Sequence, residues 1–102
     1  MELQEILEQI KAAFQTIIKE RNLHPTRLEI ELSEYGTVQI YMTAPEFSGK
    51  TGTERDMMIW PALEKKLVRK VIVHISACVL FAPEEDPDFV DSSVYASLMQ
   101  PF

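Results

Sequence analysis

Cysteine, glycine and basic residues are all scarce in this sequence. Its one cysteine, Cys78, cannot form a disulfide within the chain, which suits a reducing compartment. No apolar run approaches the ~20 residues of a membrane span, and the acidic, amphipathic N-terminus resembles neither a signal nor a transit peptide. Ten Lys and Arg against 16 Asp and Glu give a net charge of −6, which argues against binding nucleic acid mainly through its phosphates. We therefore expect a cytoplasmic protein that has no membrane span.

Residues 2–21 carry the clearest periodic pattern. Glutamates lie near the start of this segment, and Lys19 and Arg21 lie near its end, as the helix dipole favours. The pattern predicts an amphipathic helix that ends before Pro25. Its apolar stripe consists of Leu3, Ile6, Leu7, Ile10, Phe14, Ile17 and Ile18.

Residues 27–44 alternate with period two on both sides of the turn sequence SEYG. Such alternation predicts a β-hairpin with one buried and one solvent-facing side. The predicted core side consists of Leu28, Ile30, Leu32, Val38, Ile40 and Met42.

A second helix is predicted over residues 51–68, followed by a strand over 70–82. Thr51 with Glu54 fits a capping box, although Thr53 is an alternative cap. Pro61 should either kink the helix or begin a fresh one. The β-branched run KVIVHISACVLFA favours a central strand. The acidic segment 83–102 is turn-rich and should be a solvated tail, with a short helix capped by Asp91.

These elements predict a single α+β domain over residues 1–102. The expected fold is an αββαβ sandwich, in which two helices cover one face of a three-stranded mixed sheet. The other face of the sheet is expected to be open, and to carry Arg27, Glu29, Glu31, Gln39, Tyr41, His74, Ser76 and Cys78.

The stretch FSGKTGTER, residues 47–55, invites comparison with a phosphate-binding loop. A P-loop requires glycine five residues before its Gly-Lys pair, where this chain has Ala44. A nucleotide hydrolase is thereby excluded. Two interpretations stay open. The amides of Gly49, Lys50, Thr51 and Gly52, with Arg55, can hold an anion or contact a partner; alternatively, the glycines only let the chain turn, and Arg55 pairs with a carboxylate.

The region from about residue 46 to 97 resembles the BolA family. Members have a Phe-x-Gly loop, an Arg-His pair on a helix that runs to Leu-x-x-x-Leu, and a strand that opens with Val-His and closes near Pro-Glu. The matching positions here are Phe47, Gly49, Arg55, Trp60, Leu63, Leu67, Val73, His74, Pro83 and Glu84. About two extra residues around VRKVI are needed to align the strand.

The resemblance implies a non-enzymatic partner of monothiol glutaredoxins that shares an iron–sulfur cluster, with His74 as one ligand. Two positions depart from the family pattern: Asp56 replaces the histidine of the Arg-His pair, and the SEYG turn lacks the His or Cys that would be the second ligand. The family also resembles type II KH modules in fold, which would give the 49–52 loop a nucleic-acid role.

No nucleophile with an adjacent base and no metal triad can be identified by spacing, so we do not expect an enzyme. Three functions remain as alternatives: a BolA-like interaction protein with His74 and the open-face residues Tyr41, Ser76 and Cys78; a KH-like nucleic-acid module; and a homodimer that pairs through the sheet without a cofactor.

Overall fold

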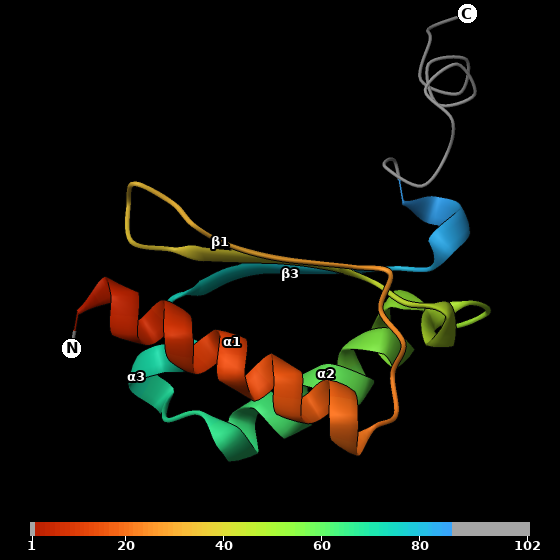
Figure 1. Cartoon of the computed structure of the whole chain (residues 1–102), viewed down its shortest axis with the longest axis horizontal. Helices are drawn as coiled ribbons and strands as arrows, with labels where there is room; N and C mark the ends of the chain where they lie inside the picture. The colour runs from red at the N-terminus through yellow and green to blue at the C-terminus, as the bar shows by residue number, and fades with distance from the viewer. Residues whose placement is uncertain (1, 87–102) are drawn as a thin grey trace, which may run out of the picture.

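Two long helices, a short helix and a three-stranded sheet make up the fold, which is known from a computed structural model that describes residues 2–86. Figure 1 shows all three helices on one face of the sheet. The predicted α+β class and its αββαβ order are confirmed, with one additional short helix. In chain order the elements are α1 (Leu3–Glu20), β1 (Arg27–Leu32), β2 (Val38–Thr43), η1 (Pro45–Phe47), α2 (Gly52–Lys66), α3 (Arg69–Ile72), β3 (Ile75–Phe81) and η2 (Pro83–Glu85).

Helix α1 forms because its apolar side chains repeat with the helical period and can be buried together. Ile10, Phe14 and Ile17 are fully buried, and each contributes about 1.5–3 kcal/mol through the burial of apolar surface. Leu3, which the periodic pattern assigns to the same stripe, is exposed instead. The helix ends at Glu20, and Asn22 follows with a left-handed φ of 54°, a conformation that asparagine tolerates well.

Strands β1 and β2 form the predicted hairpin, with Ile30 opposite Ile40 and Glu29 opposite Tyr41. The expected core side faces the helices, and Ile40 and Met42 are completely buried there. Strand β3 pairs with β2 in parallel, so the sheet order is β1-β2-β3. Two strands of the sheet are therefore edge strands, and β2 is its centre.

Helix α2 begins with the predicted capping box. The Thr51 hydroxyl accepts the Glu54 N–H at 3.1 Å, while the Glu54 carboxylate accepts the Thr51 N–H at 2.8 Å. The helix runs through Pro61 as one element. Its buried side chains are Arg55, Ile59 and Leu63.

The predicted strand over 70–82 is wrong in its first five residues. Residues 69–72 form α3, and β3 begins only at Ile75. The pairing with β2 is irregular at Ser76, because Val38 lies opposite Ile75 while Gln39 lies opposite Ala77. This one extra residue reverses the alternation of the strand. Cys78 pairs with the buried Ile40 and packs against the core, so it does not lie on the open face.

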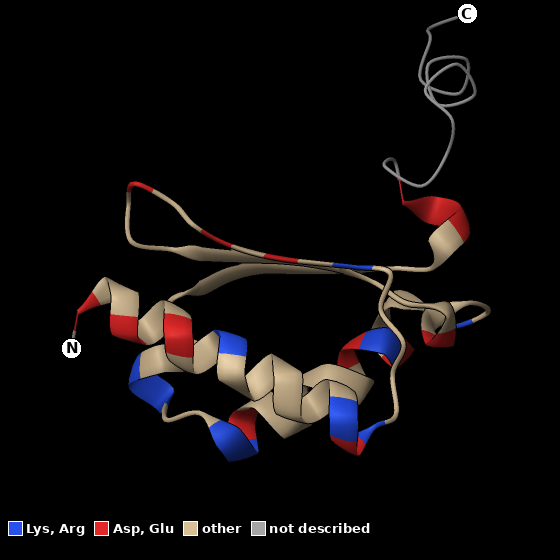
Figure 2. Ribbon diagram, in the orientation of Figure 1, with Lys and Arg blue, Asp and Glu red and all other residues tan. Residues whose placement is uncertain are grey.

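The open face of the sheet consequently differs from the expected one along β3. Register places Ala77, Val79 and Phe81 there, beside Gln39, Tyr41 and Thr43 of β2. Arg27, Glu29 and Glu31 of β1 complete this face as expected. Figure 2 shows acidic residues along the hairpin and η2, whereas Lys and Arg lie mainly on the helices. The expected helix at Asp91 lies outside the described residues.

Candidate functional site

His74 lies in the turn between α3 and β3, where it joins this turn to the tip of the β1–β2 hairpin. Its ring Nδ1 lies 2.9 Å from the Gly36 carbonyl oxygen, and its own carbonyl accepts the Val38 N–H at 2.7 Å. A carbonyl can only accept, so Nδ1 carries the proton, and the neutral ring has its lone pair on Nε2. This arrangement fixes ring orientation in the way typical of histidines that bind a metal through Nε2.

Exposed apolar side chains lie at the same end of the molecule as His74. Among residues 2–86, five large apolar side chains are exposed, and four of them belong to this end of the molecule: Leu3 at 41%, Tyr35 at 85%, Val68 at 58% and Val73 at 67%. Figure 1 shows that the start of α1, the hairpin turn and α3 lie at the same end. Leu3 is close enough to the turn that a Cβ at Gly36 would lie 3.4 Å from it.

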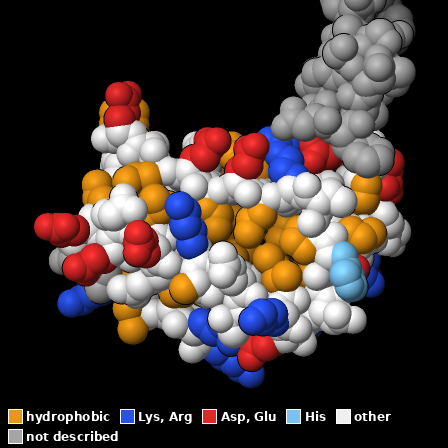
Figure 3. Space-filling view, viewed as in Figure 1, with side chains coloured by type: hydrophobic (Ala, Val, Ile, Leu, Met, Phe, Trp, Pro, Cys, Tyr) orange, Lys and Arg blue, Asp and Glu red, His pale blue; other side chains and the backbone are white. Residues whose placement is uncertain are grey.

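We call this surface the hairpin end, defined by Leu3, Tyr35, Gly36, Val68, Val73 and His74. Figure 3 shows hydrophobic side chains at the tip of the hairpin and below it on this end. Apolar residues that are exposed singly are common on soluble proteins, but a group of them marks an interaction surface. The sequence predicted His74 alone among these residues, because exposure of an apolar side chain has no local signature.

The Gly49–Arg55 loop is arranged as the start of a helix. Gly49 has a φ of +76°, which favours glycine, and residues 48–54 are exposed. The capping box satisfies the amides of Thr51 and Glu54 at the start of α2. Hydrogen bonds from the backbone and hydroxyl of Thr51 lower the pKa of the Glu54 carboxyl, which keeps a negative charge beside those amides. An incoming anion would therefore meet a carboxylate at this helix N-terminus.

Arg55 is committed to bonds within the chain. Its Nη1 and Nη2 donate to the two carboxylate oxygens of Glu85 at 2.5 and 3.1 Å. Its Nη1 also donates to the Leu80 carbonyl at 2.9 Å, and Nε donates to the Lys50 carbonyl at 3.1 Å. The hydrogen bonds with Glu85 raise the pKa of Arg55. Of the two interpretations of Arg55, pairing with a carboxylate is the one that the structure bears out.

The start of the acidic segment is bound to the domain and is not the solvated tail that its composition suggested. Asp86 is buried, accepts a hydrogen bond from the Thr43 hydroxyl, and pairs with Arg27 at 2.8 Å. Glu84 accepts a hydrogen bond from the Ser48 hydroxyl at 3.2 Å. Three successive carboxylates thus connect η2 to the loop before α2 and to the end of the sheet.

Three of the residues predicted on the open face, Tyr41, Ser76 and Cys78, have different positions. Tyr41 does lie there, with its hydroxyl 3.4 Å from the Gln39 side-chain oxygen. Ser76 is exposed at the irregular position and donates to the Val38 carbonyl at 3.3 Å. Cys78 faces the core, where burial, followed by the nearby charge of Asp56, raises the pKa of its thiol to about 12. A thiol with such a pKa remains protonated near neutral pH and is a poor metal ligand.

The donor set of the described chain does not form a metal centre. Within residues 2–86, no three His, Cys, Asp or Glu side chains converge to hold a metal ion. At the hairpin end, the described donor that is suited in orientation and chemistry is His74 Nε2. The residues present therefore fit a single ligand position, and they do not fit an iron–sulfur cluster held by this chain alone.

The described helices are also too short or too polar to cross a bilayer. Comparison with known proteins adds no relative: no protein-family model matches the chain, and no curated protein matches it in sequence.

Proposed function

We propose that this chain is a small, non-enzymatic interaction domain of BolA type, whose protein partner binds at the hairpin end. The observation that carries the proposal is the position of His74. Its ring is fixed against the hairpin turn, and four exposed apolar side chains lie at the same end of the molecule. An oriented polar group inside an apolar surface is the usual composition of a protein interface.

The partner that fits best is a monothiol glutaredoxin that carries an iron–sulfur cluster. The resemblance to BolA proteins suggests this partner, and the contact between His74 and the β1–β2 turn supports it, because the family's ligands come from these same two segments. In this chain the turn supplies no His or Cys, so His74 would be the single ligand from this side. When bound, the cluster would supply redox and cluster-transfer chemistry; His74 would contribute a lone pair at Nε2.

The KH-like alternative is less well supported. A nucleic-acid module would need free amides and cations at the 49–55 loop, whereas the capping box uses the amides of Thr51 and Glu54, and Arg55 is paired with Glu85. Lys50 alone is left for a phosphate backbone, on a chain with a net charge of −6.

The test is an anaerobic titration of this protein into a cluster-loaded monothiol glutaredoxin, followed by visible absorption and circular dichroism. His74→Asn keeps a donor near the Nδ1 position and removes Nε2, so it should abolish the spectral change while the fold persists. His24→Asn is the matched control, because His24 is the only other histidine and pairs with Glu46 away from the hairpin end. An unaltered spectral response in His74→Asn would refute the ligand role.

Docking is tested separately from cluster ligation. Tyr35→Ser and Val73→Ser each remove an exposed apolar side chain and should weaken the complex by about tenfold. Met57→Ser removes the remaining exposed apolar side chain of the described chain, outside the hairpin end, and should leave affinity unchanged. Equal losses in all three variants would refute the proposed surface. Light scattering across concentrations would identify a second copy of the chain as the occupant instead.

A further inference from the structure

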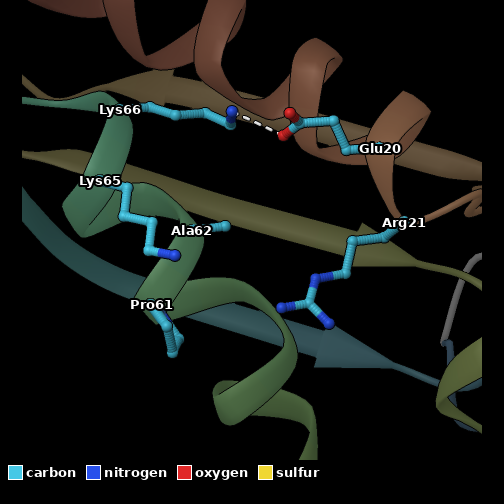
Figure 4. Close-up of a pocket in the computed structure, with 6 residues that line it drawn as sticks. All are labelled: Glu20, Arg21, Pro61, Ala62, Lys65 and Lys66. Atoms are coloured by element: carbon cyan, nitrogen blue, oxygen red, sulfur yellow. Dashed lines mark ion pairs between the residues drawn. The ribbon is translucent and has the colours of Figure 1, made fainter.

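A hollow between α1 and α2 is lined by side chains that the proposed partner surface does not use. Its volume is about 450 Å³, within the range of small-molecule sites. The end of α1 contributes two residues and the second half of α2 contributes four, as Figure 4 shows. The lining residues are Glu20, Arg21, Pro61, Ala62, Lys65 and Lys66.

One of the cations in this hollow is neutralised and two are not. Lys66 Nζ forms an ion pair with Glu20 Oε1 at 2.6 Å, and its side chain is only 24% exposed. Arg21 and Lys65 have no ion pair and no side-chain hydrogen bond with any of the residues 2–86. Figure 4 shows the guanidinium of Arg21 and the ammonium of Lys65 pointing into the same space from opposite sides.

This pair of charges belongs to the helices, on which most Lys and Arg of the molecule lie. The chain has a net charge of −6, and its buried or half-buried arginines, Arg27 and Arg55, are paired with carboxylates, whereas Arg21 and Lys65 are exposed. A small anion would experience mainly the local positive potential, because salt screens charges beyond about 8–10 Å.

We infer that this hollow binds a phosphorylated small molecule. A guanidinium can donate two parallel hydrogen bonds to a phosphate, and an ammonium adds a point charge from the other side. A phosphate monoester carries a charge of about −1.5 to −2 at neutral pH, which matches the two cations that have no ion pair within residues 2–86. The non-phosphate part of the ligand would lie on the apolar surface of Pro61 and Ala62.

The probes are inorganic phosphate and ribose 5-phosphate, titrated into the full chain at low salt while backbone amide shifts are recorded by NMR. Saturable shifts of amides at 19–23 and 60–67 are expected, and ribose 5-phosphate should bind more tightly than inorganic phosphate. If sodium chloride at equal ionic strength produces the same amide shifts as the phosphate probes, the proposed phosphate site is overturned. Equal affinity for the two probes would overturn the contact with Pro61 and Ala62.

Two double variants that remove the same charge distinguish binding at the hollow from a general effect of the protein's net charge. Arg21→Gln combined with Lys65→Gln should weaken binding by about tenfold or more, since two charged hydrogen-bond donors are lost. Lys11→Gln combined with Lys70→Gln removes the same charge from exposed positions elsewhere and should have little effect. Glu20→Gln removes the one carboxylate and should tighten binding. Equal weakening by the two double variants would refute the inference. Far-UV circular dichroism and urea unfolding verify the fold of each variant.

Discussion

Replacing Arg55 with methionine should destabilise the domain strongly, although this arginine has no role in the proposed function. Methionine is about as long as the aliphatic stem of arginine, so packing of the stem is kept while the guanidinium is lost. The Leu80 and Lys50 carbonyls then each lose a hydrogen bond from the guanidinium, and the Glu85 carboxylate loses two hydrogen bonds. A buried group without its partner costs about 1–3 kcal/mol. The Glu85 side chain is 45% exposed, so its ion pair adds at most about 1 kcal/mol.

The expected loss for Arg55→Met is therefore about 2–4 kcal/mol in the free energy of unfolding, a large share of the roughly 5–15 kcal/mol of a typical domain. Urea unfolding at pH 7 should show a lower midpoint with an unchanged slope. Glu85→Gln is the matched control. It removes only the exposed charge, leaves the bonds to the backbone carbonyls, and should cost about 0–1 kcal/mol. The reasoning is refuted if Arg55→Met costs no more than Glu85→Gln.

The same pair makes a prediction about pH. The hydrogen bonds from Arg55, followed by that from the Ala82 N–H, lower the pKa of the Glu85 carboxyl. A lowered folded-state pKa stabilises the fold at pH values above the ordinary glutamate value of about 4.3, and this stability is lost as pH falls through the folded-state value. The parent chain should therefore lose stability more steeply than Arg55→Met as pH falls from 5 to 3. If the free energies of unfolding of the two proteins fall in parallel as pH is lowered, this pH dependence does not come from the Arg55–Glu85 pair.

Three further predictions concern single positions. Thr51→Ala should lower the free energy of unfolding by about 1 kcal/mol, because it removes the helix cap; Thr53→Ala should change it little, and equal losses would place the cap elsewhere. Cys78 should not react with DTNB at pH 8 until the chain is unfolded, since burial raises the pKa of its thiol to about 12; rapid labelling of the folded chain would contradict this. Gly36→Ala, at a φ of +80°, should destabilise the chain by about 1 kcal/mol or more. Gly52→Ala, with open space around it, should stabilise it by about 0.4–1 kcal/mol, and urea unfolding that gives both variants the same sign would refute the argument.

The elements that could be predicted from the sequence are those whose cause is local. The stripe through Ile10 and Phe14 specifies α1, because residues three and four apart share a helix face. The alternation around Ile40 specifies the hairpin for the corresponding reason in a strand. Thr51 and Glu54 specify the start of α2, since the two partners of a capping box are three residues apart.

Contacts between distant residues could not be predicted in the same way. Arg55 and Glu85 are 30 positions apart, and nothing in the composition distinguishes Glu85 from the other carboxylates of the chain. The cationic hollow depends similarly on where α1 ends relative to α2, because Arg21 and Lys65 become neighbours only when the helices cross. The exposed group at the hairpin end combines a residue of α1 with others from the hairpin and α3. Each of these sites is a product of packing, and periodicity carries no information about it.

The error over residues 70–74 has the most consequence for function. Local preference favours a strand there, because β-branched residues fill the run, yet Val71 is buried in a helical turn. Cys78 faces the core opposite Ile40, so a regular strand would have directed His74, four residues earlier, into the core as well. The short helix and the extra residue at Ser76 prevent this, and they bring the imidazole to the Gly36 carbonyl at the end of the sheet. The two features that break the strand pattern are therefore the ones that place His74 at the hairpin end and keep it out of the core.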